Sequence, residues 1–163
     1  MQPTLQQLAA LSDDEFLALY EALSSQGYGP LDGEVAKAMK FRPQAIRKLP
    51  MLQRAKKGRQ ILLATRNAEL AYELLGTYLL SQSKGLVTDF LDATGVVHDE
   101  GVVGETHANV PDAARIPAAV EELDQKYTPA HVTWYLCMCV QTWPEVAEFE
   151  PLWRKRSGLA PAA

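Results

Sequence analysis

The stretch from Val35 to Ala68 contains no aspartate and no glutamate, although the chain has twenty acidic residues among its 163. The same stretch carries ten of the sixteen basic residues, so its formal charge of +10 and the −14 of the remaining residues give the net charge of −4. Charge separated on this scale can create a surface of one sign that attracts an oppositely charged partner. We call this stretch the basic segment; its basic residues are Lys37, Lys40, Arg42, Arg47, Lys48, Arg54, Lys56, Lys57, Arg59 and Arg66.

Cysteines and long apolar runs are also scarce. The two cysteines, Cys137 and Cys139, stand two residues apart in an apolar stretch. On a helix such thiols point about 200° apart, so they can neither bridge nor hold a metal together. A reduced, cytoplasmic setting is therefore expected. No apolar run approaches the roughly 18 residues of a membrane span, and residues 1–15 lack the charged and apolar regions of a secretory signal, so we expect no membrane partner.

Strand signals are nearly absent, whereas helix signals recur. Ser12 and Glu15 have the spacing of a capping box, and Pro43 and Pro50 stand where first helical positions would fall. Residues 132–140 are apolar almost all round, which is typical of a central helix. The length fits one domain. We therefore predict an all-α fold, a compact single-domain helical bundle of roughly seven to nine helices over residues 1–163.

The helix limits around the basic segment follow from capping residues and helical phase. Asp32 is expected to cap a helix that runs through Met39. The apolar stripe that follows Pro50 and the stripe beyond Asn67 lie about 150° apart on a helical projection, so one straight helix cannot bury both. We therefore predict a break at Asn67, a residue type that caps helices well.

The other regions carry fewer signals. Residues 96–109 are predicted to form an irregular acidic loop, with a minimal hairpin within residues 96–103 as the alternative. We expect this loop to be more mobile than its neighbours because it has few apolar anchors. Gly95 is expected to end the preceding helix in the left-handed conformation, and residues 154–163 are expected to form a short basic tail. The residues expected to be most buried are Trp134, Leu136, Cys139 and Val140.

Five residues of the basic segment form the candidate site. They are expected to bind a polyanion through its phosphates, helped by the open N-termini of the proline-started helices. The alternative is an ordinary solvated face whose charges are neutralised by neighbouring acidic helices. Phe41 is the one aromatic residue among these cations, so few aromatic side chains are available for stacking on nucleic-acid bases. The five residues are Arg47, Lys48, Arg54, Lys56 and Lys57.

Arg59 and Arg66 are expected to behave differently from these five. They are seven residues apart and project near the apolar stripe beside Leu62, where a guanidinium needs a carboxylate or carbonyl partner. Glu69 and Glu73 are local candidates for that partner, and a distant acid is equally open. A structural ion pair is favoured over a role in anion binding.

Metal and catalytic chemistry have weaker support. Glu69 and Glu73 are one helical turn apart but lack the Glu-x-x-His pattern of di-metal bundles, and His131 is expected to be a packed, hydrogen-bonded histidine. No nucleophile elbow, phosphate loop or dinucleotide-binding motif is present, so no catalytic residue, metal or cofactor is predicted. A solvated loop is the favoured interpretation of the metal-competent residues within 96–109, which are His98, Asp99, Glu100, Glu105 and His107.

These observations favour a non-catalytic binding module whose basic helical face engages a polyanion, with nucleic acid as the first candidate. A second hypothesis gives the same face a protein partner, either an acidic surface of another protein or a second copy of the chain in a homodimer. A third is a metal-dependent enzyme that uses His98 and His107, or Glu69 and Glu73.

Overall fold

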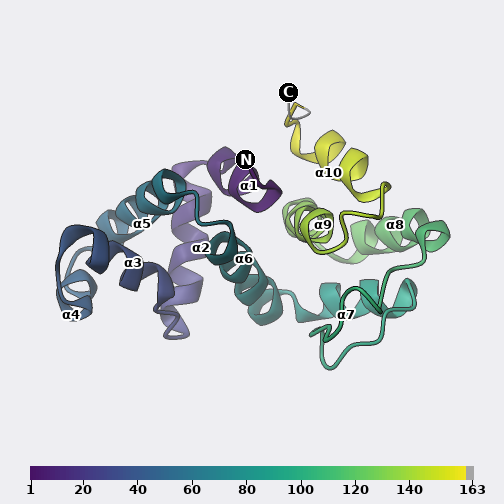
Figure 1. Ribbon diagram of the computed structural model, residues 1–163, viewed down its shortest axis with the longest axis horizontal. Helices are drawn as coiled ribbons and strands as arrows, with labels where there is room; N and C mark the ends of the chain where they lie inside the picture. Colours follow the sequence, from purple (N-terminus) through teal and green to yellow (C-terminus); the bar gives the residue numbers. More distant parts are fainter. Residues whose placement is uncertain (161–163) are drawn as a thin grey trace. The chain divides into compact units, whose positions relative to one another are not determined.

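The structure, a computed structural model, describes residues 1–160, and over that range it confirms the all-α prediction. Ten α-helices and one short 3-10 helix are present there and no strand is (Figure 1). The chain divides into two compact units, Met1–Leu74 and Leu75–Ala163. The prediction of a single domain over residues 1–163 stays a prediction. None of the described helices is both long enough and apolar enough to cross a membrane.

The first unit contains five helices and the beginning of a sixth. The first of them, at Pro3–Ala10, was not predicted, so the ten α-helices exceed the expected seven to nine. Ser12 and Glu15 form the predicted capping box, in which each residue accepts a hydrogen bond from the other's backbone N–H. The helices are α1 (Pro3–Ala10), α2 (Asp13–Ser25), α3 (Pro30–Met39), α4 (Pro43–Arg47), α5 (Met51–Thr65) and α6 (Ala68–Gln82).

Helix α5 is the centre of the first unit, because α1, α2 and α3 all contact it, while α4 packs on α3 (Figure 1). Its buried positions are Ala55, Gly58 and Leu62, a spacing of three and four residues that lies on one helical face. A Cβ at Gly58 would lie 2.9 Å from the Cδ2 atom of Leu31. Glycine at this position therefore allows α3 to approach α5 closely.

The break between α5 and α6 falls where the sequence predicts it. Arg66 takes the left-handed conformation, with φ of 52°, and the side chain of Asn67 accepts a hydrogen bond from the backbone N–H of Leu70 at 3.0 Å. The prediction for Asp32 was wrong. Helix α3 begins at Pro30 and Asp32 is buried inside it, so its carboxylate does not cap the helix.

The second unit packs around α9, which contacts both α8 and α10, while α7 contacts α8. Leu136, Cys139 and Trp134 are buried as predicted, whereas Val140 is half-buried. Cys137 and Cys139 are both free and buried. The helices of this unit are α7 (Lys84–Ala93), the 3-10 helix η1 (Ala113–Arg115), α8 (Ile116–Lys126), α9 (Pro129–Thr142) and α10 (Phe149–Ser157), and it also contains the end of α6.

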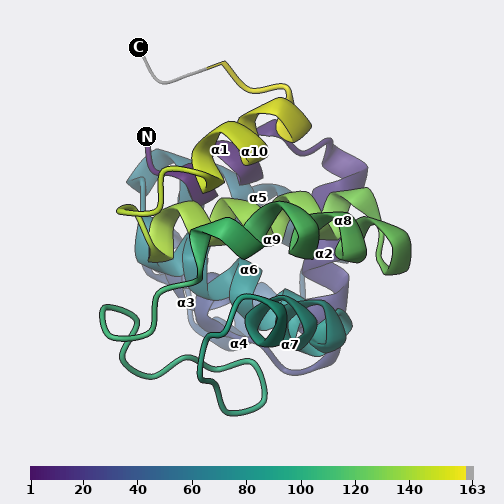
Figure 2. The same cartoon turned by 90° about the vertical axis from the view of Figure 1, so that its right-hand side faces the viewer.

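Residues 96–109 form the irregular loop between α7 and η1, drawn in teal and green in Figure 2. Gly95 is left-handed as predicted, with φ of 76°. One isolated antiparallel bridge joins Asp99 to Val102, so the segment is the predicted irregular loop with a single paired position, and the alternative hairpin does not extend over residues 96–103. The loop has an anchor that was not predicted: the indole N–H of buried Trp143 donates to the carbonyls of Thr106 and Asn109, at 3.1 and 2.9 Å.

The predicted basic tail is helical where it begins. Arg154, Lys155 and Arg156 belong to α10, which ends at Ser157. The guanidinium of Arg154 pairs with Glu150 and that of Arg156 pairs with Asp124. These contacts hold the two arginines against the second unit, whereas Lys155 is exposed. The last three residues of the predicted tail, 161–163, lie outside the described residues.

Candidate functional site

Four of the five candidate site residues lie on the outside of the first unit. Arg47, Lys48 and Lys56 are exposed, and Lys57 is half-exposed. Arg54 is different, because only 12 % of its side chain is exposed and its guanidinium lies 2.8 Å from the carboxylate of Asp32. The prediction that Arg54 belongs to the outer basic face was therefore wrong.

Helical phase explains the position of Arg54. It projects from one flank of the buried face of α5, toward α2 and α3, where Asp32 lies with 5 % of its side chain exposed. A carboxylate buried to that extent needs charged or hydrogen-bonding partners. Its Oδ2 atom accepts from Nη2 of Arg54, and its Oδ1 atom accepts from the hydroxyl of Tyr20. The pair is thus a structural element of the first unit.

The same network includes the aromatic ring of Tyr20 and the hydroxyl of Ser24. The guanidinium of Arg54 lies over the Tyr20 ring, 5.4 Å from its centre, and its Nη2 also donates to Ser24 at 3.2 Å. Burial and the hydrogen bond to Asp32 raise the pKa of Tyr20 to about 12. The Tyr20 hydroxyl therefore stays protonated and keeps donating at neutral pH.

Arg59 occupies the opposite flank of α5, about 140° away from Arg54 at 100° per residue. Its guanidinium donates to the carbonyls of Ala9 and Leu11 at the end of α1 and pairs with Asp13 at 3.0 Å. The prediction of a carboxylate or carbonyl partner is confirmed, with a distant acid in place of Glu69 or Glu73. Because Asp13 opens α2 and Ser24 is near its end, Arg54 and Arg59 attach α5 to both ends of α2.

Arg66 does not share the position of Arg59. It is exposed and left-handed at the C-terminal end of α5, so the expectation that it projects near the apolar stripe was wrong. The left-handed backbone turns the chain at this residue and directs the side chain to solvent.

Eight cations of the basic segment remain after Arg54 and Arg59 are set aside. Within residues 1–160, Arg54 and Arg59 are the only residues of the basic segment that form an ion pair. The remaining eight cations are therefore without an ionic partner in that range. The expectation of neutralisation by neighbouring acidic helices therefore holds for two positions and fails for the unpaired cations, which are Lys37, Lys40, Arg42, Arg47, Lys48, Lys56, Lys57 and Arg66.

Five of these unpaired cations come from 12 consecutive residues, 37–48, and all five are exposed. Their backbone folds around Ile46, which is fully buried in a small apolar cluster with Val35 and Ala36. Because α4 packs on α3 through this cluster, the charges lie on its outer side. We call this group the α3–α4 cluster; its members are Lys37, Lys40, Arg42, Arg47 and Lys48.

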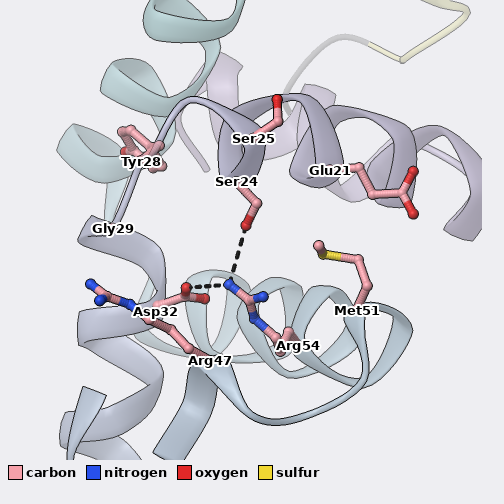
Figure 3. A pocket seen from close by; sticks show the side chains of 10 residues that line it. Glu21, Ser24, Ser25, Tyr28, Gly29, Asp32, Arg47, Met51 and Arg54 are labelled. Carbon is pink, nitrogen blue, oxygen red and sulfur yellow. Dashed lines mark hydrogen bonds and ion pairs between the residues drawn. The ribbon is translucent and has the colours of Figure 1, made fainter. Parts of the chain in front are cut away.

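A pocket of 490 Å³ lies beside the Arg54–Asp32 pair (Figure 3). Its wall comes from α2, the turn that follows it, α3, and the residues at the end of α4 and the start of α5. Of the five candidate residues, Arg47 and Arg54 line it, whereas Lys48, Lys56 and Lys57 do not. The lining residues are Glu21, Ser24, Ser25, Gly27, Tyr28, Gly29, Asp32, Arg47, Met51 and Arg54.

Three residues of this site, Asp32, Tyr20 and Ser24, were not predicted from the sequence. One signal was present for Asp32. It precedes Val35 and Ala36 by three and four residues, so it lies on the buried face of α3. A carboxylate on such a face indicates a buried partner, and Arg54 is the cation placed to supply it.

Two of the metal-competent residues of the loop, His98 and Glu100, are engaged in other contacts. His98 accepts a hydrogen bond at Nδ1 from the N–H of Gly101, at 3.0 Å, and its Nε2 lies 2.8 Å from Asp92. Glu100 pairs with Lys84, and His107 is exposed. Within residues 1–160, no three His, Cys, Asp or Glu side chains gather in a way that could hold a metal ion.

His131 is packed and hydrogen-bonded, as predicted. Its Nδ1 lies 2.6 Å from the hydroxyl of Ser83 and its Nε2 lies 3.1 Å from the hydroxyl of Tyr78. Its ring also contacts that of Trp134, with the centres 5.4 Å apart. Burial lowers the pKa of His131, so the imidazole is neutral at physiological pH.

Comparison of the chain with models of known protein families, with curated proteins and with solved structures found no match.

Proposed function

We propose that this protein is a non-catalytic binding module whose first unit engages a polyanion, with nucleic acid as the first candidate. The contact surface consists of the α3–α4 cluster, extended by Lys56 and Lys57 on the outer face of α5. Arg54 is left out of this surface because its charge is used by Asp32. The two buried free cysteines fit a reducing compartment, and the proposal places the protein in the cytoplasm.

The observation that supports this function is the lack of ionic partners for the surface cations. An arginine or lysine that is paired within its own fold is already neutralised by a carboxylate, so it attracts a charged ligand weakly. An unpaired one attracts phosphate without that competition. Five exposed and unpaired charges lie within residues 37–48, so a phosphate backbone can meet several of them at once. The contacts are to phosphates, and binding should therefore depend little on base sequence.

Gel retardation with duplex DNA and with RNA tests the proposal. Neutralising about five phosphates gives a log–log salt slope near −4 to −5 for duplex DNA. Lys48→Ala and Lys56→Ala should each flatten that slope by about one unit, since each removes one phosphate contact. Lys155→Ala is the matched control, because Lys155 is an exposed lysine on α10, outside the proposed surface.

Two results would contradict the proposal. The first is no retardation of either nucleic acid at about 50 mM salt, where this electrostatic contribution is strong. The second is a salt slope that Lys155→Ala changes as much as Lys48→Ala does. Self-association on size-exclusion chromatography without any ligand would instead assign the basic surface to a homodimer.

A further inference from the structure

The turn between α3 and α4 carries an exposed aromatic ring within the α3–α4 cluster. Phe41 is 51 % exposed, and within residues 37–48 it is the one large apolar side chain that is exposed. Its neighbours in the chain, Lys40 and Arg42, are both exposed cations of the cluster. In Figure 1, α4 lies beyond α3 at one end of the first unit. The ring is therefore open to the same ligand that the cations attract.

Two backbone hydrogen bonds fix the position of this ring. Lys40 takes the left-handed conformation, with φ of 55°, and its N–H donates to the carbonyl of Lys37 at 3.3 Å. The N–H of Phe41 donates to the carbonyl of Ala36 at 2.8 Å. Together these bonds form a Schellman motif at the end of α3. Arg42 is extended because a proline follows it, so the backbone is held on both sides of Phe41.

Two features of this motif differ from its usual form. The left-handed position is usually glycine, which has no Cβ to strain the backbone, but here it is Lys40. The residue that follows commonly packs an apolar side chain back on the helix, but half of Phe41 stays in solvent. Folding therefore accounts neither for the charge of Lys40 nor for the exposure of Phe41. Both suit a ligand that has negative charge and a flat apolar face.

A single strand of nucleic acid presents these two groups together. Its phosphates are charged, and its unpaired bases expose faces that stack on aromatic side chains. In a duplex the neighbouring base pairs already cover these faces, so a ring outside the double helix has no base to stack on. A lipid surface is less suitable, because interfacial binding uses a broad apolar face, and residues 37–48 expose a single large apolar side chain.

We propose that the α3–α4 cluster binds single-stranded nucleic acid in preference to the duplex. The ring of Phe41 stacks on one unpaired base, and the cations beside it, Lys40 and Arg42, contact the phosphates on either side of that base. This inference rests on the proposed function, because it uses the same surface, and it adds the form of the ligand and a residue that recognises it. Stacking tolerates any base, so binding still depends little on sequence.

Fluorescence anisotropy on the full chain tests the preference. The probes are a labelled DNA strand of about 20 nucleotides without self-complementarity, the RNA strand of the same sequence, and the DNA duplex made from the first. At about 150 mM salt, where the attraction of phosphates is weakened more than stacking, both single strands should bind at least about fivefold more tightly than the duplex. Phe41→Ala should weaken the binding of the strands by at least about fivefold and that of the duplex by less than about twofold.

Further variants identify the contact as stacking. Phe41→Tyr keeps an aromatic face and should bind the strands as the unchanged protein does, whereas Phe41→Leu keeps apolar bulk without that face and should behave like Phe41→Ala. Because the ring carries no charge, Phe41→Ala should leave the salt slope of single-strand binding unchanged. Lys40→Gly should flatten that slope by about 0.7 unit, since it removes one phosphate contact. Glycine suits the left-handed position, so this variant should lose affinity without losing stability.

Leu52→Ala is the matched control. Leu52 is an apolar residue of α5 that is 47 % exposed and lies outside the α3–α4 cluster, so its removal should change the affinity for neither form of nucleic acid. Phe41 and Leu52 are both exposed, and the variants are therefore expected to fold. Thermal melting of every variant separates a lost contact from a lost fold.

Three results would overturn this inference. The first is a duplex that binds as tightly as the single strands, and the second is a Phe41→Leu variant that binds the strands as well as the unchanged protein does. The third is a Phe41→Ala variant that loses affinity for vesicles of anionic phospholipid but not for the strands, since the ring would then serve a lipid surface. In each case the proposed function stands if nucleic acid is still bound, whereas a lack of binding to the strands and to the duplex contradicts that function itself.

Discussion

Replacing Arg54 by methionine should destabilise the first unit strongly, because the change removes the charge and leaves the carboxylate of Asp32 buried. The exposed fractions of the two side chains are 12 % and 5 %, so the relevant comparison is a buried ion pair. Breaking such a pair by removing one partner costs about 3–5 kcal/mol, whereas losing a surface pair costs about 0–1 kcal/mol. Arg54→Met should therefore lower the free energy of unfolding by about 3–5 kcal/mol.

Urea unfolding followed by circular dichroism measures this change, and a double-mutant cycle assigns it to the pair. Asp32→Leu combined with Arg54→Met removes both charges, so the double variant should lose much less stability than the two single losses added together. Lys56→Met, two residues along on the outer face of α5, is the control and should stay within about 0.5 kcal/mol of the unchanged protein. A loss below about 1 kcal/mol for Arg54→Met, or additive losses in the cycle, would show that the pair is not a buried structural element.

Three further predictions concern an ion pair on the other flank of α5, an apolar core residue and a packed histidine. Arg59→Ala should lower the free energy of unfolding and shift the urea midpoint, because it removes the bonds that join α5 to Asp13 and to the end of α1; an unchanged midpoint would exclude that role. Leu136→Ala should cost about 2–5 kcal/mol in the same assay, since Leu136 is fully buried in α9, and a cost below about 1 kcal/mol would make α9 peripheral. Because burial lowers the pKa of His131, the unfolded chain takes up the proton first as the pH falls, so this part of the stability is complete above about pH 6.5 and is lost below it. Urea midpoints at pH 7.5 and pH 5 should therefore differ less in His131→Asn than in the unchanged protein, and an equal difference would contradict the assignment.

The helices could be predicted from the sequence because their signals are local. The capping box at Ser12 and the break at Asn67 depend on residues three or four positions apart, and both lie where the pattern indicates. Gly95 ends its helix for the same kind of reason, since a left-handed residue follows the last turn. Signals of this range need no knowledge of which helices touch one another.

The contacts that decide the roles of individual charges are not local. Arg54 meets Asp32, 22 residues earlier, and Arg59 meets Asp13, 46 residues earlier. Helical phase shows that both arginines lie on the flanks of α5, but it does not show which helix covers each flank. The anchor of the 96–109 loop is a similar case, because Trp143 reaches Asn109 from 34 residues away. Sequence periodicity therefore predicts which faces are buried better than it predicts their partners.

A run of one charge sign is informative about function only after each charge has been matched with its partner in the fold. In the basic segment this separates the two arginines on the flanks of α5, whose charges stabilise α2 and α3, from the exposed cations that have no ionic partner. The distinction decides how a loss of binding is interpreted. A variant of Arg54 that fails to bind nucleic acid would report unfolding of the first unit. A variant of Lys48 or Lys56 would report loss of a phosphate contact. Measuring stability and salt slope on the same variants therefore separates the structural charges from the binding charges, and the proposed function requires that the two sets of residues do not overlap.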